Sequence, residues 1–182
     1  MEKWRRLGSS EIRISPVIMG MWQAGKEMWA GIDDAETQRS VRAAVDAGIN
    51  AFDTAEMYGD GGSEEALGKA LGARRDEVVI ASKVSPQHCA PEQLRTACEA
   101  SLKRLGTDYI DLYQVHWPFR EPSFDAAYDA LDRLRREGKI RAIGVSNFGA
   151  CDLTDWLAAG EAASNQLGYN LIFRAVEYNI AP

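Results

Sequence analysis

Four residues whose side chains can move a proton stand at or near the ends of predicted strands. Asp53 is followed five residues later by Tyr58. Lys83 comes directly after the apolar run 78–82, and His116 directly follows the predicted strand 109–115. An ammonium group that follows an apolar strand is expected to be buried, and it then needs a partner, because burying an unpaired charge is costly. Asp53 can supply that partner, and Tyr58 can share the hydrogen bonds of Lys83.

These side chains together match the needs of carbonyl reduction. A carbonyl group that accepts a hydride becomes an alkoxide, which a general acid must protonate. A free tyrosine has a pKa of about 10, and a neighbouring lysine cation favours the phenolate and lowers that value. We therefore expect Tyr58 to be the acid, with a pKa lowered by Lys83. His116 is expected to hydrogen-bond the carbonyl oxygen and polarise it.

Asp53, Tyr58 and His116 alone also have ordinary structural explanations, whereas Lys83, directly after an apolar run, has no obvious solvated position and favours function. Asp53 by itself is typical of a turn or helix cap, Tyr58 of packing, and a single strand-end histidine of a structural role. Taken as a set at converging strand ends, they favour function. The other histidine, His88, lies in a loop and is expected to be solvated and uninvolved.

The glycine-rich stretch 59–63 has some likeness to a phosphate-binding loop. Two acidic residues, Glu64 and Glu65, follow it directly and would repel a phosphate. Acidic side chains are instead favourable in the first turn of a helix. The stretch is therefore predicted to be a turn in which Ser63 caps the following helix.

Apolar runs and helical periodicities alternate along the chain and predict the elements that hold these side chains. Glycines follow most of the helical patterns directly and mark their ends. Segments 4–7 and 12–14 predict a short hairpin with its turn at residues 8–10. Strands are predicted over 17–20, 50–52, 78–82, 109–115, 140–145 and 164–167, and helices over 34–47, 63–71, 91–105, 123–137 and 152–159.

Strict alternation of strand and helix predicts a parallel sheet covered by helices. An open doubly wound sheet and a (β/α)8 TIM-type barrel both have this pattern. No G-x-G-x-x-G motif follows the first strand, which removes the main support for a dinucleotide-binding open sheet. The barrel is favoured because the active site of such a barrel lies where its strands end, and polar residues stand there in five predicted strands: Asp53, Lys83, His116, Ser146 and Gln166.

Composition narrows the class of protein further. The 182 residues carry 21 basic and 27 acidic side chains, a net charge of −6, which argues against a nucleic-acid or anionic-membrane partner. No apolar run reaches the roughly 18 residues of a membrane helix, and no signal-peptide core follows the basic N-terminal residues. Three cysteines without disulfide or zinc spacing indicate a reduced, cytoplasmic setting.

Several short motifs, in order and spacing, resemble the aldo-keto reductase superfamily over essentially the whole chain. Any one of them is weak, but the set is specific. The motifs are Asp53–Gly59 (DTAEMYG), Ser82-Lys83, 106–112 (GTDYIDL), His116–Pro118 (HWP), 135–143 (RREGKIRAI), Gly144–Phe148 (GVSNF) and Asn165–Asn170 (NQLGYN).

The resemblance implies an NADPH-dependent reductase of aldehydes, ketones or sugar carbonyls that uses no metal. It implies that Tyr58 is the proton donor in a catalytic tetrad completed by Asp53, Lys83 and His116. It further implies contacts to the nicotinamide cofactor from Asp53, Ser146, Asn147 and Gln166. Two tryptophans, Trp22 and Trp117, are expected to line the substrate pocket.

Residues 1–182 are expected to form a single, C-terminally incomplete domain, since such barrels take about 250 residues. Six of eight strand–helix units, or three-quarters of the barrel, are predicted, without the last two strands and the cofactor-phosphate loop. Open sheet edges predict self-association, and the missing loop predicts weak cofactor binding. A non-catalytic nicotinamide-binding regulatory subunit and an inactive fragment stay open as alternatives, as do the substrate and the choice between NADPH and NADH.

Overall fold

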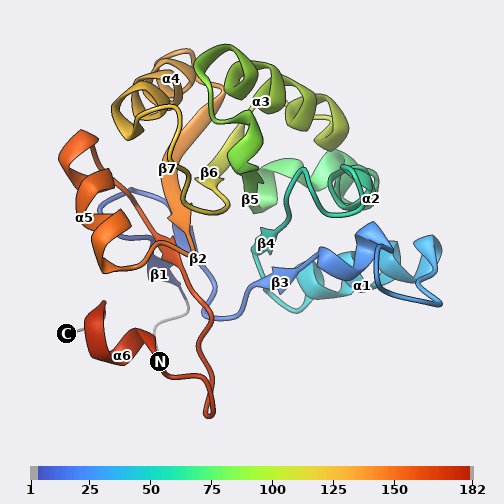
Figure 1. The fold of residues 1–182 in the computed structure, drawn as a ribbon. Helices are drawn as coiled ribbons and strands as arrows, with labels where there is room; N and C mark the ends of the chain where they lie inside the picture. Colours follow the sequence, from blue (N-terminus) through green and yellow to red (C-terminus); the bar gives the residue numbers. More distant parts are fainter. Residues whose placement is uncertain (1–3, 181–182) are drawn as a thin grey trace.

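Six short parallel strands, arranged in chain order, form the centre of the molecule (Figure 1). The computed structural model describes residues 4–180. The sheet curls so that its two edge strands, β3 and β8, leave one side open. Its strands are β3 (Met19–Gly20), β4 (Ala51–Asp53), β5 (Val79–Val84), β6 (Ile110–Val115), β7 (Ile140–Ser146) and β8 (Asn165–Gln166).

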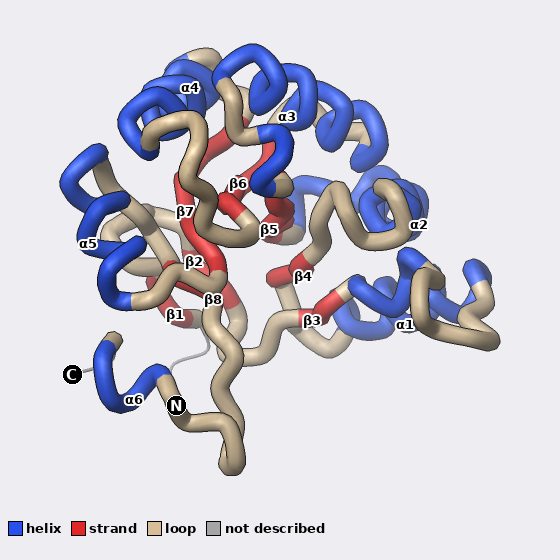
Figure 2. The backbone as a smooth tube through the Cα atoms, in the orientation of Figure 1, coloured by secondary structure: helices blue, strands red, loops and turns tan. Residues whose placement is uncertain are grey.

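Helices connect successive strands and lie outside the curl (Figure 2). Apolar side chains between helices and strands, including Phe52, Ile80, Tyr113 and Trp156, are fully buried and form the core. The helices are α1 (Asp34–Asp46), α2 (Gly62–Leu71), α3 (Pro91–Leu105), α4 (Phe124–Arg136), α5 (Ala150–Ala159) and the short α6 (Val176–Asn179), with 3-10 turns η1 (Trp22–Gly25), η2 (Gly72–Glu77) and η3 (Pro86–His88). The predicted six-unit, TIM-type α/β architecture is confirmed.

The predicted N-terminal hairpin is present as β1 (Arg5–Arg6) paired antiparallel with β2 (Arg13–Ile14). Asn50, which precedes β4, holds it: its Oδ1 accepts from the Ser15 backbone N–H at 2.7 Å, and its Nδ2 donates to the Arg13 carbonyl at 2.9 Å. At the hairpin turn Gly8 has φ 53°, and a Cβ there would lie 2.2 Å from the Ala163 carbonyl oxygen. The hairpin therefore packs against the amino ends of the strands.

One local prediction needs correction. Ser63 does not cap α2: the cap position is Gly61, and no side chain caps that helix. The Ser63 hydroxyl instead donates to the Met21 carbonyl at 2.7 Å and lies 2.8 Å from Thr54 Oγ1. Ser63 therefore ties α2 to the segments after β3 and β4, a role set by tertiary contacts.

Strand register brings the polar strand ends together. Asp53 pairs with Ala81, Lys83 pairs with Gln114, and Ser146 pairs with Gln166 across adjacent strands. Parallel strands present their carboxyl ends at one edge of the sheet, and alternate residues face the same side. The predicted site residues on these strands are therefore neighbours in space, although they are far apart in the chain. Among residues 4–180, no helix is long and apolar enough to cross a membrane.

Candidate active site

A cavity of about 530 Å³ opens at the carboxyl ends of the strands. Eight of the nine side chains predicted for the site line it, from Trp22 after β3 to Gln166 on β8. The ninth, Asp53, lies behind Lys83 and faces the interior of the curled sheet. The structure thus gathers the whole predicted set in one place.

Lys83 is the buried centre of this site, with 1% of its surface exposed. Its Nζ lies 2.8 Å from the Asp53 carboxylate and donates to the Thr54 carbonyl at 2.8 Å. A third, longer contact of 3.4 Å joins Nζ to the Tyr58 hydroxyl. Asp53 and Thr54 are therefore the main hydrogen-bond acceptors of the Lys83 ammonium group, and the Tyr58 hydroxyl makes a weaker contact with it.

The expected lowering of the Tyr58 pKa is wrong for this structure. Burial raises the pKa of Tyr58 to about 12, and the negative charge of Asp53 adds to the effect. Lys83 does not reverse this, because its charge is compensated by Asp53 at 2.8 Å, closer than the phenol at 3.4 Å. Burial also lowers the pKa of Lys83, against the opposing influence of Asp53. The phenol is therefore held in its protonated form.

His116 stands over the Tyr58 ring in a T-shaped contact, with 5.5 Å between ring centroids. Burial, aided by the nearby Lys83 cation, lowers the pKa of His116 to about 4. Its imidazole is consequently neutral at physiological pH and has one N–H to donate. Nδ1 is buried and has no hydrogen-bond partner among the described residues. A neutral ring beside the phenol can donate to a carbonyl oxygen without competing for the proton.

Lowering the pH from 7 to 5 is expected to reduce the free energy of unfolding by about 2 kcal/mol through His116 alone. The unfolded chain protonates this histidine near pH 6.5, whereas the folded pKa is about 4. The unfolded state therefore gains the proton first, and stability falls as pH falls between these values. Urea unfolding at both pH values measures the change. Between pH 7 and pH 5 the free energy of unfolding of His116→Gln should fall by about 2 kcal/mol less than that of wild type. The same pH dependence in both proteins would contradict the lowered pKa of His116.

Ser146, Asn147 and Gln166 form one connected group at the ends of β7 and β8. The Ser146 hydroxyl donates to the Gln166 backbone carbonyl at 3.1 Å. Asn147 adopts φ 63°, a left-handed conformation that asparagine tolerates better than most residues. Its Nδ2 donates to the His116 carbonyl at 2.9 Å and to Ser146 Oγ at 3.0 Å. The group is thus rigidly held beside His116.

Tryptophans form the outer wall of the cavity. Trp22 and Trp117 line it and remain 44% and 51% exposed, so they are accessible to a ligand. Trp22 lies 6.3 Å from Tyr58 between ring centroids, and Trp29 packs edge-on against Trp22 at 5.7 Å. Trp29 belongs to none of the sequence motifs described above. Its contact with Trp22 shows that the loop between η1 and α1 shapes this wall.

Two supporting contacts were missed by sequence reasoning. A Cβ on Gly59, which has φ 61°, would lie 1.9 Å from the Gly25 carbonyl oxygen. Backbone contact at these glycines therefore holds η1 against the Tyr58 loop. His88, expected to be uninvolved, places Nδ1 3.0 Å from Glu56 Oε1, which also accepts from the Ser85 backbone N–H at 2.6 Å. Of these two contacts, only the first has a sequence feature that could have indicated it, the glycines Gly25 and Gly59. The contact between His88 and Glu56 has none.

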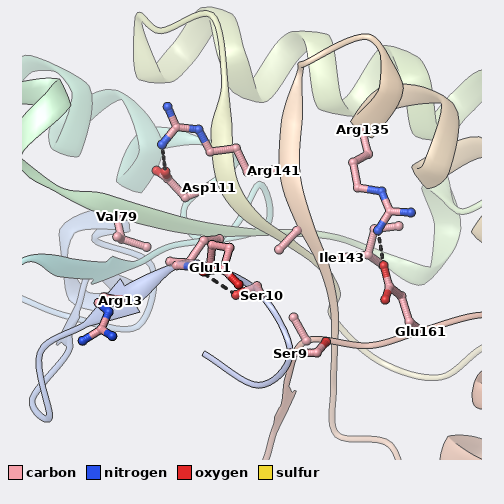
Figure 3. A pocket seen from close by; sticks show the side chains of 13 residues that line it. Ser9, Ser10, Glu11, Arg13, Val79, Asp111, Arg135, Arg141, Ile143 and Glu161 are labelled. Atoms are coloured by element: carbon pink, nitrogen blue, oxygen red, sulfur yellow. Dashed lines mark hydrogen bonds and ion pairs between the residues drawn. The ribbon is translucent and has the colours of Figure 1, made fainter. Parts of the chain in front are cut away.

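A second large cavity, of about 540 Å³, lies at the opposite end of the strands beneath the hairpin (Figure 3). Two of its three arginines face acidic partners: Arg141 Nη1 lies 3.0 Å from Asp111 Oδ1, and Arg135 pairs with Glu161. These charges neutralise each other within the protein. The cavity at the carboxyl ends is therefore the candidate active site.

Comparison with known proteins identifies the family of the chain. Residues 16–182 match the model of the aldo/keto reductase family. The chain is 38% identical to the methylglyoxal reductase YeaE and 34% identical to the NADH-specific methylglyoxal reductase, both of Escherichia coli. These matches cover 96% and 97% of the chain and 61% of each relative.

Solved structures give the same picture. The aldo/keto reductase of Klebsiella pneumoniae, solved with NADP and acetate, is 37% identical and superimposes with a TM-score of 0.88. The match covers 99% of this chain and 63% of that protein. The chain thus spans about three-fifths of the length of these relatives. This share is smaller than the three-quarters predicted from the number of strand–helix units. With the family model matched over residues 16–182, the chain belongs to the aldo/keto reductase family.

Proposed function

We propose that this protein is an NADPH-dependent reductase of aldehydes and ketones in which Tyr58 donates the proton. The observation that carries the proposal is the position of Lys83 Nζ, 2.8 Å from Asp53 and 3.4 Å from the Tyr58 hydroxyl. A pure binding module has no need for a buried cation beside a phenol. The relatives named above as reductases support the same chemistry.

Proton transfer follows from the environment of Tyr58. The substrate carbonyl oxygen is proposed to sit between the Tyr58 hydroxyl and the neutral His116 ring. A pKa of about 12 keeps the phenol protonated until it is needed. An alkoxide is a stronger base than a phenolate, so the proton passes to it as negative charge develops. The Lys83 ammonium then stabilises the phenolate that remains.

The residues at the ends of β7 and β8 fit a nicotinamide. Asn147 and Gln166 present amide groups to the cavity, and Ser146 joins them. Amide groups in this arrangement suit the carboxamide of the cofactor. A reduced nicotinamide bound there supplies the hydride. Asp53, behind Lys83, is proposed to face the same side of the site. We favour NADPH, in line with the Klebsiella pneumoniae structure that contains NADP.

The walls of the cavity suit a small carbonyl compound. Its outer side is formed by Trp22, Trp117 and the exposed side chains of Met28 and Met57. Among the described residues, the buried Lys83 is the one cationic side chain that lines the cavity, beside the neutral His116, so an anionic substrate has no exposed cation to pair with. Short aldehydes and ketones, including the methylglyoxal named for two relatives, are the proposed substrates.

Consumption of NADPH in the presence of a panel of aldehydes and ketones tests this function. We expect carbonyl-dependent loss of the reduced-nicotinamide absorbance with methylglyoxal and with simple aldehydes. NADH is run in parallel, since one relative is named as specific for it. Binding of NADPH without turnover of any carbonyl would support the regulatory-subunit alternative, and turnover with NADH alone would overturn the cofactor assignment.

A further inference from the structure

A glutamine lies inside one of the most buried strands. Gln114 is the fifth residue of β6 (IDLYQV), every residue of which is buried, and 1% of its surface is exposed. Burying an amide without hydrogen-bond partners costs several kcal/mol, roughly 2–7. The amide group of Gln114 is therefore expected to have hydrogen-bond partners inside the protein.

Two partners hold Gln114 in one orientation. Its Oε1 accepts from the Ser164 hydroxyl at 3.2 Å, and its Nε2 donates to Gln166 Oε1, also at 3.2 Å. Strand β7 lies between β6 and β8, and its residue in register with Gln114 is Gly144. A Cβ at Gly144 would lie 2.7 Å from Ser164 Oγ and 3.0 Å from Gln114 Cγ. The missing side chain thus makes room for hydrogen bonds across β7.

The direction of these bonds decides what Gln166 offers to a ligand. Because Gln166 Oε1 already accepts from Gln114, the Nε2 group is the end left to donate. Asn147 is held in the opposite sense: its Nδ2 donates to His116 and Ser146, which leaves Oδ1 to accept. One donor and one acceptor side by side are complementary to a primary carboxamide, which has one carbonyl oxygen and one NH2.

We propose that Gln114 is a positioning residue that orients the Gln166 amide, so that its NH2 meets the carbonyl oxygen of the nicotinamide carboxamide. The inference rests on the proposed function, because it takes the cofactor to be a nicotinamide dinucleotide. Gln114 acts through Gln166 and does not touch the ligand. Ser164 and Gly144 support it, the first by hydrogen bonding and the second by its lack of a side chain.

A double-mutant cycle on NADPH affinity, measured by fluorescence titration, tests the proposal. Gln114→Met keeps the shape of the side chain but removes both hydrogen bonds. We expect it to raise the Kd for NADPH about 3- to 10-fold, the value of one neutral hydrogen bond. Gln166→Leu should have an effect at least as large. In the Gln166→Leu background Gln114→Met should have no further effect, since it has lost the group through which it acts.

The controls separate orientation from general damage. Gln93→Met makes the same change on the exposed face of α3 and should leave the Kd unchanged. Ser164→Ala, which frees the Gln114 carbonyl, should weaken NADPH binding in the same direction and serves if Gln114→Met folds poorly. Fully additive effects of Gln114→Met and Gln166→Leu, or no effect of Gln114→Met, overturn the inference alone. A wild-type protein that binds no NADPH overturns the proposed function and the inference with it.

Discussion

Replacing Tyr58 by phenylalanine is expected to lower kcat for carbonyl reduction by about 10²- to 10⁴-fold, the usual contribution of a general acid. The substitution removes one oxygen atom and keeps the ring that contacts His116 and Trp22. NADPH affinity should change little, because the side chains proposed to hold the nicotinamide carboxamide are Ser146, Asn147 and Gln166, at the ends of β7 and β8. Steady-state kinetics with a simple aldehyde, together with NADPH titration, measure both quantities.

A matched control is available in the same chain. Tyr178 is 79% exposed in α6 and is not one of the residues that line the cavity, so Tyr178→Phe should keep the wild-type kcat. Unfolding of both variants by urea shows whether any loss of kcat reflects loss of folded protein. If Tyr58→Phe turns over aldehydes at the wild-type rate, the acid is another group and the proposed mechanism fails.

Asp111→Asn is expected to reduce the free energy of unfolding by about 3–5 kcal/mol, as when one partner of a buried ion pair is removed. Asp111 is 2% exposed, and its carboxylate lies 2.7 Å from Arg75 and 3.0 Å from Arg141. It also accepts from the Ile80 backbone N–H at 3.0 Å. Both guanidinium groups stack on Tyr109, at 4.1 and 3.8 Å, and stay close together when the carboxylate charge is lost.

Urea unfolding measures this loss, with Asp108→Asn as its control. Asp108 is exposed three residues earlier, so its substitution should change stability by less than about 0.5 kcal/mol. Asp111 lines the cavity at the far end of the strands from Tyr58. The folded fraction of Asp111→Asn should therefore keep its kcat. A variant as stable as wild type would show that solvent, and not the protein, compensates these charges.

Local chemistry made much of the fold predictable. Pro91 at the first turn and Gly106 after the last residue bound α3 as expected, because proline suits a helix start and glycine adopts the left-handed φ of 65° that ends it. Strand ends were less predictable. The run 17–20 is a strand only at Met19–Gly20, since pairing with β4 and not apolarity sets its length.

The candidate site was predictable as a set of residues but not as an electrostatic environment. Parallel strands present their ends at one edge, so Lys83 and Asp53 were expected to meet, and they do so at 2.8 Å. The direction of the Tyr58 pKa was mistaken, because it depends on burial and on whether Lys83 lies closer to the phenol or to Asp53. Differences of less than 1 Å decide that balance, and no residue pattern records them.

By itself, the order of residue types determined the alternation of strand and helix, the family resemblance and the identity of the side chains at the strand ends. These depend on periodicity and on neighbours in the chain, which a sequence contains directly. The tertiary structure alone decided that Ser63 joins two loops, that Trp29 supports Trp22, and that Gln114 orients Gln166 across Gly144. The contacts of Ser63 with Met21 and of Gln114 with Gln166 join residues more than 40 positions apart, and the ring contact of Trp29 with Trp22 depends on how one loop folds back. The direction of the Gln114 hydrogen bond arises only when the strands are in register.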